Sequence, residues 1–472
     1  MLFLIPVIIV LVLVILAAFL FEYGPGKIGG GPDLPTELPP PIITYDDISG
    51  STPYVAPDVK ERLNQHIGQR KLFVSEIQFI TKYVGLTEPS LVVYAGGAPS
   101  NKAALLAELC PNVLFLLVDP NPFDVHPPTK WNRDSPYGVN NTLPRMLIPG
   151  ADPEGLSRSR ITQGLETVRE KYDILKDKYS KGTLYDPEDP RERILLFNTY
   201  YVPEHSAALR SVFPTEKIYF LSDIRTIIND DPFPVDVDIS WNIAQQYIWS
   251  RLLGAEATMV KWRWPWFNPE DKSMISPSSI ARNDFDISAL GEYKDELGVV
   301  HSFPPIDFIA DYAAKSIRYP SGVIYLQAWN RTTSGETRLV FMRDAPVIDQ
   351  STIGVYEDKL FWYNSVARQG PVNNVAIPRK PTEYQKRKIR ELRIDNCNDC
   401  AIEATVWQEY ILAQPPGMNA RLDVYHYMAM LTHATHGRKL HPPQEILRRN
   451  IIAKYNRVFD NFNKKKAQQA DV

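Results

Sequence analysis

The stretch Leu91-Val-Val-Tyr-Ala-Gly-Gly-Ala-Pro-Ser100 decides the fold. Its first half is a short apolar run, typical of a strand that is buried on both faces. Its second half consists of small residues, which allow a tight turn at the end of that strand. A helix is predicted at residues 101–110 and a second strand at residues 113–118. A strand, a turn of small residues and a helix form the unit that brings backbone close to a nucleotide.

Further strands are predicted along the rest of the chain, separated by helical patterns. They lie at residues 194–197, 217–221, 257–260, 322–329 and 338–342. Before the first strand, apolar residues recur at helical spacing and predict a helix over residues 71–84; they are Phe73, Ile77, Ile80 and Val84. Strands that alternate with helices indicate a doubly wound, mostly parallel α/β sheet.

The chain of 472 residues divides into four predicted parts. Residues 1–21 are uncharged and apolar, close to the ~20 residues that a membrane-spanning helix needs, so we expect a transmembrane anchor. No basic residue precedes this run, which argues against a cleaved signal peptide. Residues 22–57 are rich in Gly and Pro and predict a tether. A catalytic domain is predicted at 58–440, with a polar rim insertion at about 121–191 that contains a helix at 161–179, and a basic segment at 441–472.

Composition places the chain among ordinary globular proteins. Hydrophobic residues make up 44% of it and charged residues 23%, and the net charge of −3 argues against a general nucleic-acid binder. Basic residues are nevertheless concentrated in the final segment and in one earlier run. Such clusters either contact phosphates or form a solvated helix face. The earlier run contains Arg379, Lys380, Lys386, Arg387, Lys388, Arg390 and Arg393.

Cysteine usage suits a reducing compartment and gives no disulfide framework. The three cysteines are Cys110, Cys397 and Cys400. Cys397 and Cys400 have the spacing of half a zinc site, but no second pair completes it. Histidines could supply the remaining ligands in principle, namely His426, His433 and His436. The sequence predicts no metal site.

The turn after residues 91–94 is a candidate cofactor loop. Gly96 and Gly97 remove side chains where a ligand must come near, and Asp119 ends the next strand, where an acid can bind ribose hydroxyls. The same geometry serves dinucleotides and S-adenosylmethionine, and a purely structural turn is the alternative. The residues predicted to contact the cofactor are Tyr94, Gly96, Gly97, Ala98, Pro99, Asp119 and Asp223.

Four charged residues stand where a doubly wound fold builds its active site. Asp223 and Lys261 end strands, Glu336 lies between the last two strands, and Lys71 opens the first helix. Each alone would be an ordinary surface charge. Together, in the order Lys-Asp-Lys-Glu, they predict a catalytic centre.

These motifs resemble one family, the poxvirus-type cap-specific mRNA 2′-O-methyltransferases, which are also small subunits of viral poly(A) polymerase. The resemblance covers residues 71–427, except for residues 120–191, and includes neither the anchor nor the tether. Further matches occur at Tyr356-Glu-Asp-Lys-Leu360 and, more loosely, at Asp423-Val-Tyr-His426. The main motifs are Lys71-Leu-Phe-Val-Ser-Glu76, Val92-Val-Tyr-Ala-Gly-Gly-Ala-Pro99, Leu221-Ser-Asp-Ile-Arg225 and Lys261-Trp-Arg-Trp-Pro265.

The resemblance implies an S-adenosylmethionine-dependent fold and a catalytic tetrad of Lys71, Asp223, Lys261 and Glu336. The implied reaction transfers a methyl group to the ribose 2′-hydroxyl beside an mRNA cap, with Lys261 as general base. A hydroxyl is a poor nucleophile unless a base removes its proton. A lysine accepts a proton only when neutral, so this chemistry requires a lysine pKa well below ~10.4. The two carboxylates are expected to orient the lysines and the hydroxyl.

The resemblance also implies a site that stacks the cationic 7-methylguanine of the cap between aromatic rings. Trp266 stands at the stacking position, and Tyr45 and Tyr54 are equal candidates for the second ring. Trp262, Trp264 and Trp266 alternate along the chain, so at least one of them is expected to be buried in the core. Two departures concern the cap rather than catalysis: Asn268 replaces a family carboxylate and Thr333 a tyrosine. The remaining predicted cap-binding residues are Arg263, Ser334 and Glu357.

The expected partners are capped mRNA, a membrane contacted through the N-terminal helix, and, as the resemblance implies, a poly(A) polymerase catalytic subunit. The catalytic domain is expected to face the cytoplasm or to be virion-associated. Three other functions stay open. They are a non-catalytic cap- or RNA-binding subunit of a polymerase, a scaffold that keeps the fold without its chemistry, and a nicotinamide oxidoreductase. The last would need neither the second lysine nor the tryptophan run.

Overall fold

The computed structural model describes most of residues 38–436. The described ranges are 38–54, 65–125, 145–148, 158–182, 190–225, 236–264, 292–294, 300–302, 310–311, 316–331, 334–350, 355–414 and 422–436. Residues 41–472 belong to one compact unit, and residues 1–40 are assigned to another.

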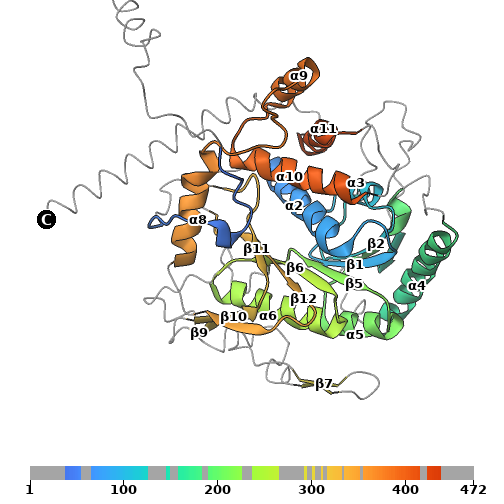
Figure 1. Cartoon of the computed structure of the whole chain (residues 1–472). Helices are drawn as coiled ribbons and strands as arrows, with labels where there is room; N and C mark the ends of the chain where they lie inside the picture. Colours follow the sequence, from blue (N-terminus) through green and yellow to red (C-terminus); the bar gives the residue numbers. More distant parts are fainter. Residues whose placement is uncertain are drawn as a thin grey trace, which may run out of the picture. The chain divides into compact units, whose positions relative to one another are not determined.

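A twisted eight-stranded sheet forms the centre of this unit (Figure 1). The strands from β6 to β3 run parallel, whereas β11 and β12 are antiparallel additions at one edge. The predicted mostly parallel α/β sheet is therefore confirmed. Across the sheet, the order is β11 (Val323–Tyr325), β12 (Thr337–Met342), β6 (Ala257–Trp262), β5 (Ile218–Ser222), β1 (Ser90–Ala95), β2 (Val113–Val118), β4 (Ile194–Phe197) and β3 (Arg145–Ile148).

Helices cover both faces of the sheet because its central strands are apolar on both sides. Every residue of β1 and β2 is buried. Val92 and Tyr94 pack among the helices of one face, and Leu91 and Val93 among those of the other. The first face is covered by α2 (Gln65–Phe79), α3 (Ala103–Leu109), α10 (Asn398–Ala413) and α11 (Val424–His436). The second is covered by α4 (Arg158–Ser180), α5 (Pro203–Val212) and the C-terminal part of α6 (Asp236–Leu253).

A third apolar cluster fills the edge formed by β6, β11 and β12. Helix α8 (Val355–Ser365) and the first half of α6 contribute to it, whereas α9 (Glu383–Leu392) buries none of its residues. Smaller elements complete the described structure. They are β13 (Val347–Gln350), β10 (Ser316–Pro320) and β9 (Ala310–Asp311) in one sheet, β7 (Glu292–Lys294) and β8 (Val300–Ser302) in another, a π-helical turn at Ile80–Val84, and 3₁₀ turns at Tyr45–Asp47, Pro190–Arg193 and Ala367–Gln369.

The structure corrects the predicted insertion at residues 121–191. This region was expected to lie on the rim, yet β3 extends the main sheet beside β4. Helix α4 also belongs to the core, because Leu165, Val168 and Tyr172 are at most 3% exposed. The polar residues of α4 lie on its outer face, and in the sequence they obscure the apolar residues of its inner face. The described part of this region is therefore integral to the fold.

The structure also corrects the end of the predicted tether. Residues 41–54 pack on the compact unit, where Tyr45 is 7% and Ile48 2% exposed. Asn398 fixes this strap through two hydrogen bonds: it accepts from the Ile42 amide and donates to the Ile42 carbonyl, at 2.7 and 3.0 Å. Thr44 forms an isolated bridge with Tyr325. Proline-rich composition masked a segment held by a few specific contacts.

The predicted anchor at residues 1–21 lies outside the described residues, as does the whole basic segment at 441–472. Among the helices that the structure does describe, none combines the length and the apolar character that crossing a membrane requires.

The strap offers a direct test of the corrected boundary. Ile48→Ala should lower the free energy of unfolding by roughly 2–5 kcal/mol, the usual cost of truncating a buried Ile or Leu. Urea unfolding followed by circular dichroism measures the change. Leu412→Ala, on an α10 side chain that is 74% exposed, is the matched control and should change stability little. If Ile48→Ala left the free energy of unfolding unchanged, residues 41–54 would belong to the tether and not to the folded unit.

Candidate functional site

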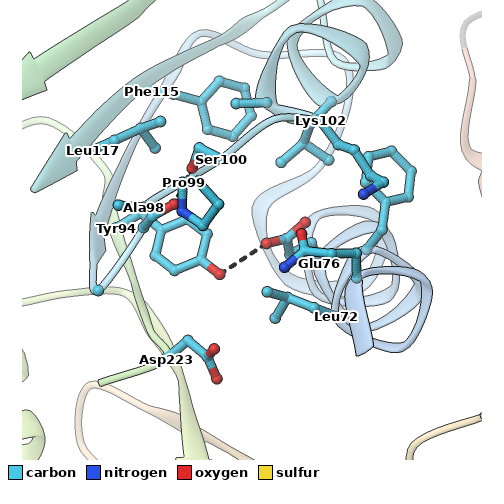
Figure 2. Close-up of a pocket in the computed structure, with 16 residues that line it drawn as sticks. Leu72, Glu76, Tyr94, Ala98, Pro99, Ser100, Lys102, Phe115, Leu117 and Asp223 are labelled. Atoms are coloured by element: carbon cyan, nitrogen blue, oxygen red, sulfur yellow. Dashed lines mark hydrogen bonds between the residues drawn. The ribbon is translucent and has the colours of Figure 1, made fainter. Parts of the chain in front are cut away.

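A cavity opens at the carboxyl ends of β1 and β5, where the strand order reverses. β1 pairs with β2 on one side and with β5 on the other, so the loops that follow β1 and β5 diverge. Such a switch point is where doubly wound sheets bind ligands. The cavity is open to solvent, and together with its mouth it comprises about 540 Å³ of space free of protein atoms. It is bounded by α2, α3 and these two loops (Figure 2).

The predicted cofactor loop forms one wall of this cavity. Gly96 has a φ of +78°, and a Cβ there would lie 2.9 Å from the Ile224 backbone nitrogen, so glycine is required. At Gly97 a Cβ would make only ordinary contacts at 3.5 Å or more, so the protein alone does not require glycine there. The predicted residues that line the cavity are Tyr94, Gly96, Gly97, Ala98, Pro99 and Asp223.

Asp119, predicted to bind ribose, does not line the cavity. Its carboxylate accepts from the Ala98 amide at 3.0 Å and from the Asn121 backbone and side-chain nitrogens at 2.8 and 2.9 Å. In the structure, therefore, Asp119 holds the cofactor loop to the next strand. A carboxylate has further lone pairs, so direct ribose contact stays a prediction.

Two charged residues that the sequence reading did not select also line the cavity, Glu76 and Lys102. The Tyr94 hydroxyl donates to Glu76 at 2.8 Å, as Figure 2 shows. Burial raises the pKa of Glu76 to about 7, although this hydrogen bond opposes the shift. Burial also lowers the pKa of Lys102 to about 8. Apolar side chains make up the other walls, among them Leu72, Phe73, Leu106, Phe115 and Leu117.

The four predicted catalytic residues meet beside this cavity. Lys71 lies 2.8 Å from one oxygen of Glu336, and Lys261 lies 3.6 Å from the other. Lys261 is also 3.4 Å from Asp223. A fifth residue completes the group, because Arg338 contacts Asp223 at 2.6 Å and Glu336 at 3.5 Å. We call Lys71, Asp223, Lys261, Glu336 and Arg338 the ionic cluster.

Strand register explains why the carboxylates are needed. β6 and β12 are antiparallel, and Lys261 stands directly opposite Arg338. Like charges in that position repel each other. Asp223 and Glu336 contact both cations and so neutralise the repulsion. Arg338 is 2% exposed, and a buried charge of this kind persists only when it is paired.

Burial and charge together set the ionisation of the cluster. Burial alone would raise the pKa of Glu336, but Lys261, Lys71 and Arg338 hold it well below its usual value. Burial likewise opposes the shift at Asp223, where Arg338 and Lys261 still keep the pKa below normal. Burial lowers the pKa of Lys71, against the attraction of Glu336. Both carboxylates are therefore ionised at neutral pH.

Helices α2 and α8 fix the positions of Lys71 and Glu336. Next to Lys71, Arg70 forms a buried double hydrogen bond with Glu403 of α10, at 2.8 and 2.9 Å. Tyr356 of α8 donates to the Gly335 carbonyl at 3.1 Å, and Asn364 donates to the Ser334 carbonyl at 2.9 Å. The turn at residues 334–336 thus rests on α8, and Ser334 is part of this support.

The predicted cap residues are only partly described. Arg263 and Glu357 form an ion pair at 3.4 Å, beside the turn that carries Glu336. Trp266 and Asn268 lie outside the described residues, as does Thr333. The expected burial within the tryptophan run is confirmed, since Trp262 is 0% and Trp264 2% exposed.

The structure separates the two tyrosines that were candidates for the second stacking ring. Tyr45 is buried against Tyr356 and Trp264, with ring centroids 5.1 and 6.4 Å away. Tyr54 is half-buried, and its backbone amide donates to Asp358 at 2.9 Å. Burial and the charge of Glu357 raise the pKa of Tyr54, and the charge of Arg263 lowers it. Tyr54 is therefore the more exposed of the two rings, and the charges of two other predicted cap residues act on it.

Helix α9 carries most of the basic run at residues 379–393. Lys386, Arg387 and Arg390 are exposed, and Lys386 and Arg387 pair within the helix with Glu383 and Glu391. Exposure and partial pairing fit both a phosphate contact and a solvated face. Neither alternative is excluded.

Sequence reasoning missed Arg338, Glu76 and Lys102. Arg338 follows Glu336 by two positions at the start of a strand, a spacing that places both side chains on one side. Glu76 was visible as a charge between the apolar positions Phe73 and Ile77 of a helix. Lys102 carried no such signal, because its place depends on how the loop folds.

The comparisons with known proteins found no matching family model and no matching curated protein.

Glu76 makes stability depend on pH in a testable way. In the folded protein its pKa of about 7 exceeds the ordinary 4.5. The protonated carboxyl therefore contributes fully to the free energy of unfolding below about pH 4.5, and this contribution is lost as the pH rises to about 7. Glu76→Gln can still accept from Tyr94 but cannot ionise. Its free energy of unfolding, relative to the unsubstituted protein, should rise by roughly 2–3 kcal/mol between about pH 5 and about pH 8.

Urea unfolding at the two pH values measures this difference. Glu383→Gln, at a side chain that is 85% exposed, controls for the loss of a surface charge. A difference that does not change with pH would show that Glu76 ionises normally.

Proposed function

We propose that this protein is a cap-specific mRNA 2′-O-methyltransferase that uses S-adenosylmethionine. The observation that carries the proposal is the position of Asp223. Asp223 lines the cavity and also contacts Lys261, 3.4 Å away. A ligand in the cavity would therefore end beside a lysine that belongs to the tetrad implied by the family resemblance.

The cavity fits the proposed cofactor chemically. S-adenosylmethionine combines an apolar adenine, a ribose, a cationic sulfonium and an amino-acid tail with both charges. The walls combine apolar surfaces, such as Phe115 and Leu117, with an anionic group at Asp223, a carboxyl of raised pKa at Glu76 and a cationic group at Lys102. Anionic groups suit the sulfonium and the ammonium, and a lysine suits the carboxylate. When bound, this cofactor supplies an electrophilic methyl group.

The ionic cluster supplies what the other reactant needs. In this proposal, a ribose hydroxyl next to Lys261 loses its proton to that lysine as it attacks. Lys71 and Lys261 contact the two oxygens of the same carboxylate, Glu336, so a proton gained by one changes the field at the other. Arg338 keeps Asp223 and Glu336 in place and ionised. Most of the rate should come from this positioning.

Charge near the cluster suits a nucleic-acid substrate. Lys71, Lys261 and Arg338 outnumber Asp223 and Glu336. Arg225 also lies near, and burial lowers its pKa only to about 10, so it stays cationic at neutral pH. The excess of positive charge would attract RNA phosphates.

We also propose that residues 1–21 anchor the protein to a membrane, with the domain on the cytoplasmic side or in a virion.

Lys261→Met tests the chemistry. The variant keeps the length of the side chain but cannot accept a proton. Methyl transfer from labelled S-adenosylmethionine to capped RNA should fall by ~10²–10⁴-fold, the usual contribution of a positioned base. Calorimetry should show near-normal binding of S-adenosylmethionine and of capped RNA. Lys217→Met, at a surface lysine that is 57% exposed, is the matched control.

Two outcomes would overturn the proposal. Normal turnover in Lys261→Met would remove Lys261 from the mechanism. If the unsubstituted protein bound capped RNA but methylated no RNA, it would be a binding subunit, of the kind that stimulates a poly(A) polymerase.

Glu357 and Tyr54 test cap recognition. Glu357→Gln should weaken binding of 7-methylguanosine triphosphate by ~1–3 kcal/mol, the usual loss for a charged hydrogen-bond partner. Tyr54→Ala should weaken binding of the methylated nucleotide more than that of guanosine triphosphate, because a ring attracts the cationic base more strongly. Fluorescence titration measures both affinities, and Tyr384→Ala, on the exposed side of α9, is the control. Equal losses for the two nucleotides would exclude stacking by Tyr54.

A further inference from the structure

The turn before α10 brings together three side chains that ligate metal ions, Asp395, Cys397 and Cys400. One donor atom from each lies within 4.8 Å of the other two. The sequence alone contains only half of a zinc site at this position, and the fold adds a carboxylate to it. None of these residues takes part in the cavity or in the ionic cluster.

Local structure holds the three donors in place. Cys397 is the residue that precedes the first turn of α10, and Cys400 lies within that turn, so helical geometry sets their separation. The Cys397 amide donates to the Asp395 side chain at 3.0 Å. The preceding chain clamps this turn, because Asn374 donates to the Asp395 carbonyl at 2.7 Å and Val372 to the Asn396 carbonyl at 2.7 Å. The arrangement is therefore built into the fold.

The donor set suits a zinc ion. Zinc binds thiolate sulfur at ~2.3 Å and carboxylate oxygen at ~2.0–2.2 Å, so tetrahedral ligands lie roughly 3.5–3.8 Å apart. Donors already within 4.8 Å need only small movements to reach that geometry. Two thiolates and a carboxylate carry three negative charges, which more than balance a dication.

We propose that Asp395, Cys397 and Cys400 bind one zinc ion. Binding requires both thiols to lose their protons to solvent. Cys400 is 4% exposed, whereas Cys397 and Asp395 are half-buried, so the site is open on one side. Three protein ligands leave a fourth position for water. His426 is occupied elsewhere, with its ring 2.7 Å from Asp423.

A disulfide between the two cysteines is the main rival. Cys-x-x-Cys at the start of a helix also occurs in redox proteins. The carboxylate favours the metal, since disulfide chemistry makes no use of a third anionic donor beside the sulfurs, whereas a dication does.

The ion would stabilise the part of α10 on which other segments depend. Asn398, the first residue of α10, holds the strap at Ile42. Glu403, one turn farther on, holds Arg70 next to Lys71. Zinc would thus fix the helix that positions a catalytic lysine without touching the reactants, and its role would be structural.

Cobalt substitution tests the proposal directly. The full-length protein, treated with chelator under reducing conditions, is titrated with Co²⁺ and then with Zn²⁺. One Co²⁺ per chain should give a thiolate-to-cobalt charge-transfer absorption, which Zn²⁺ abolishes. Cys397→Ser and Cys400→Ser should lose this absorption, and Asp395→Asn should weaken Zn²⁺ binding at least ~10-fold. Cys110→Ser, at a buried cysteine elsewhere, is the matched control and should behave normally.

Three results would overturn the proposal. The first is the absence of thiolate-to-cobalt absorption in the unsubstituted protein, a test that requires no variant to fold. The second is unchanged Zn²⁺ binding by Asp395→Asn and Cys397→Ser. The third is protein purified without reductant in which Cys397 and Cys400 are joined, with a mass two hydrogens lower and no bound metal. None of these results depends on methyl transfer, so the zinc site and the proposed function stand or fall separately.

Discussion

The pairing of β6 with β12 places Lys261 opposite Arg338, and the remaining geometry of the site depends on relieving that repulsion. Two carboxylates do so, one from the loop after β5 and one from the turn before β12. Glu336 then attracts Lys71 from α2. Four separate elements are thereby brought to one point by charge. Removing either carboxylate would leave buried cations uncompensated, which costs more than the pair itself contributes.

The same arrangement joins the cavity to the cluster. Asp223 follows β5 and is held next to β1, because its amide donates to the Ala95 carbonyl at 3.1 Å. Gly96 permits this close approach, since any side chain there would meet Ile224. A backbone requirement at one glycine therefore determines where a carboxylate stands, and that carboxylate both lines the cavity and belongs to the ionic cluster. The position of the Asp223 side chain thus depends on main-chain atoms of Ala95, Gly96 and Ile224.

How well each feature could be predicted from the sequence depended on how local its cause was. The central strands were predictable because continuous apolar runs such as residues 113–118 have no other use in a soluble domain. The proximity of Asp223 and Lys261 was predictable because strand ends meet at one edge of a sheet. The strap at residues 41–54 was not, because its order comes from Asn398 and Tyr325, far away in sequence. Ribose binding by Asp119 stays a prediction, but its hydrogen bond to the loop could not be predicted, because only the folded turn creates that contact.

The excess of cations over carboxylates in the ionic cluster has a practical consequence. Small multivalent anions resemble the charged part of a nucleic acid, and they would collect where Lys71, Lys261 and Arg225 lie. Under the proposed function, phosphate or sulfate buffers would compete with RNA at this cluster, and polyanions such as heparin would compete at far lower concentration. The proposed methyl transfer would therefore be slower in those buffers than in their absence. Chloride would interfere more gently, by general screening over a distance of ~8–10 Å.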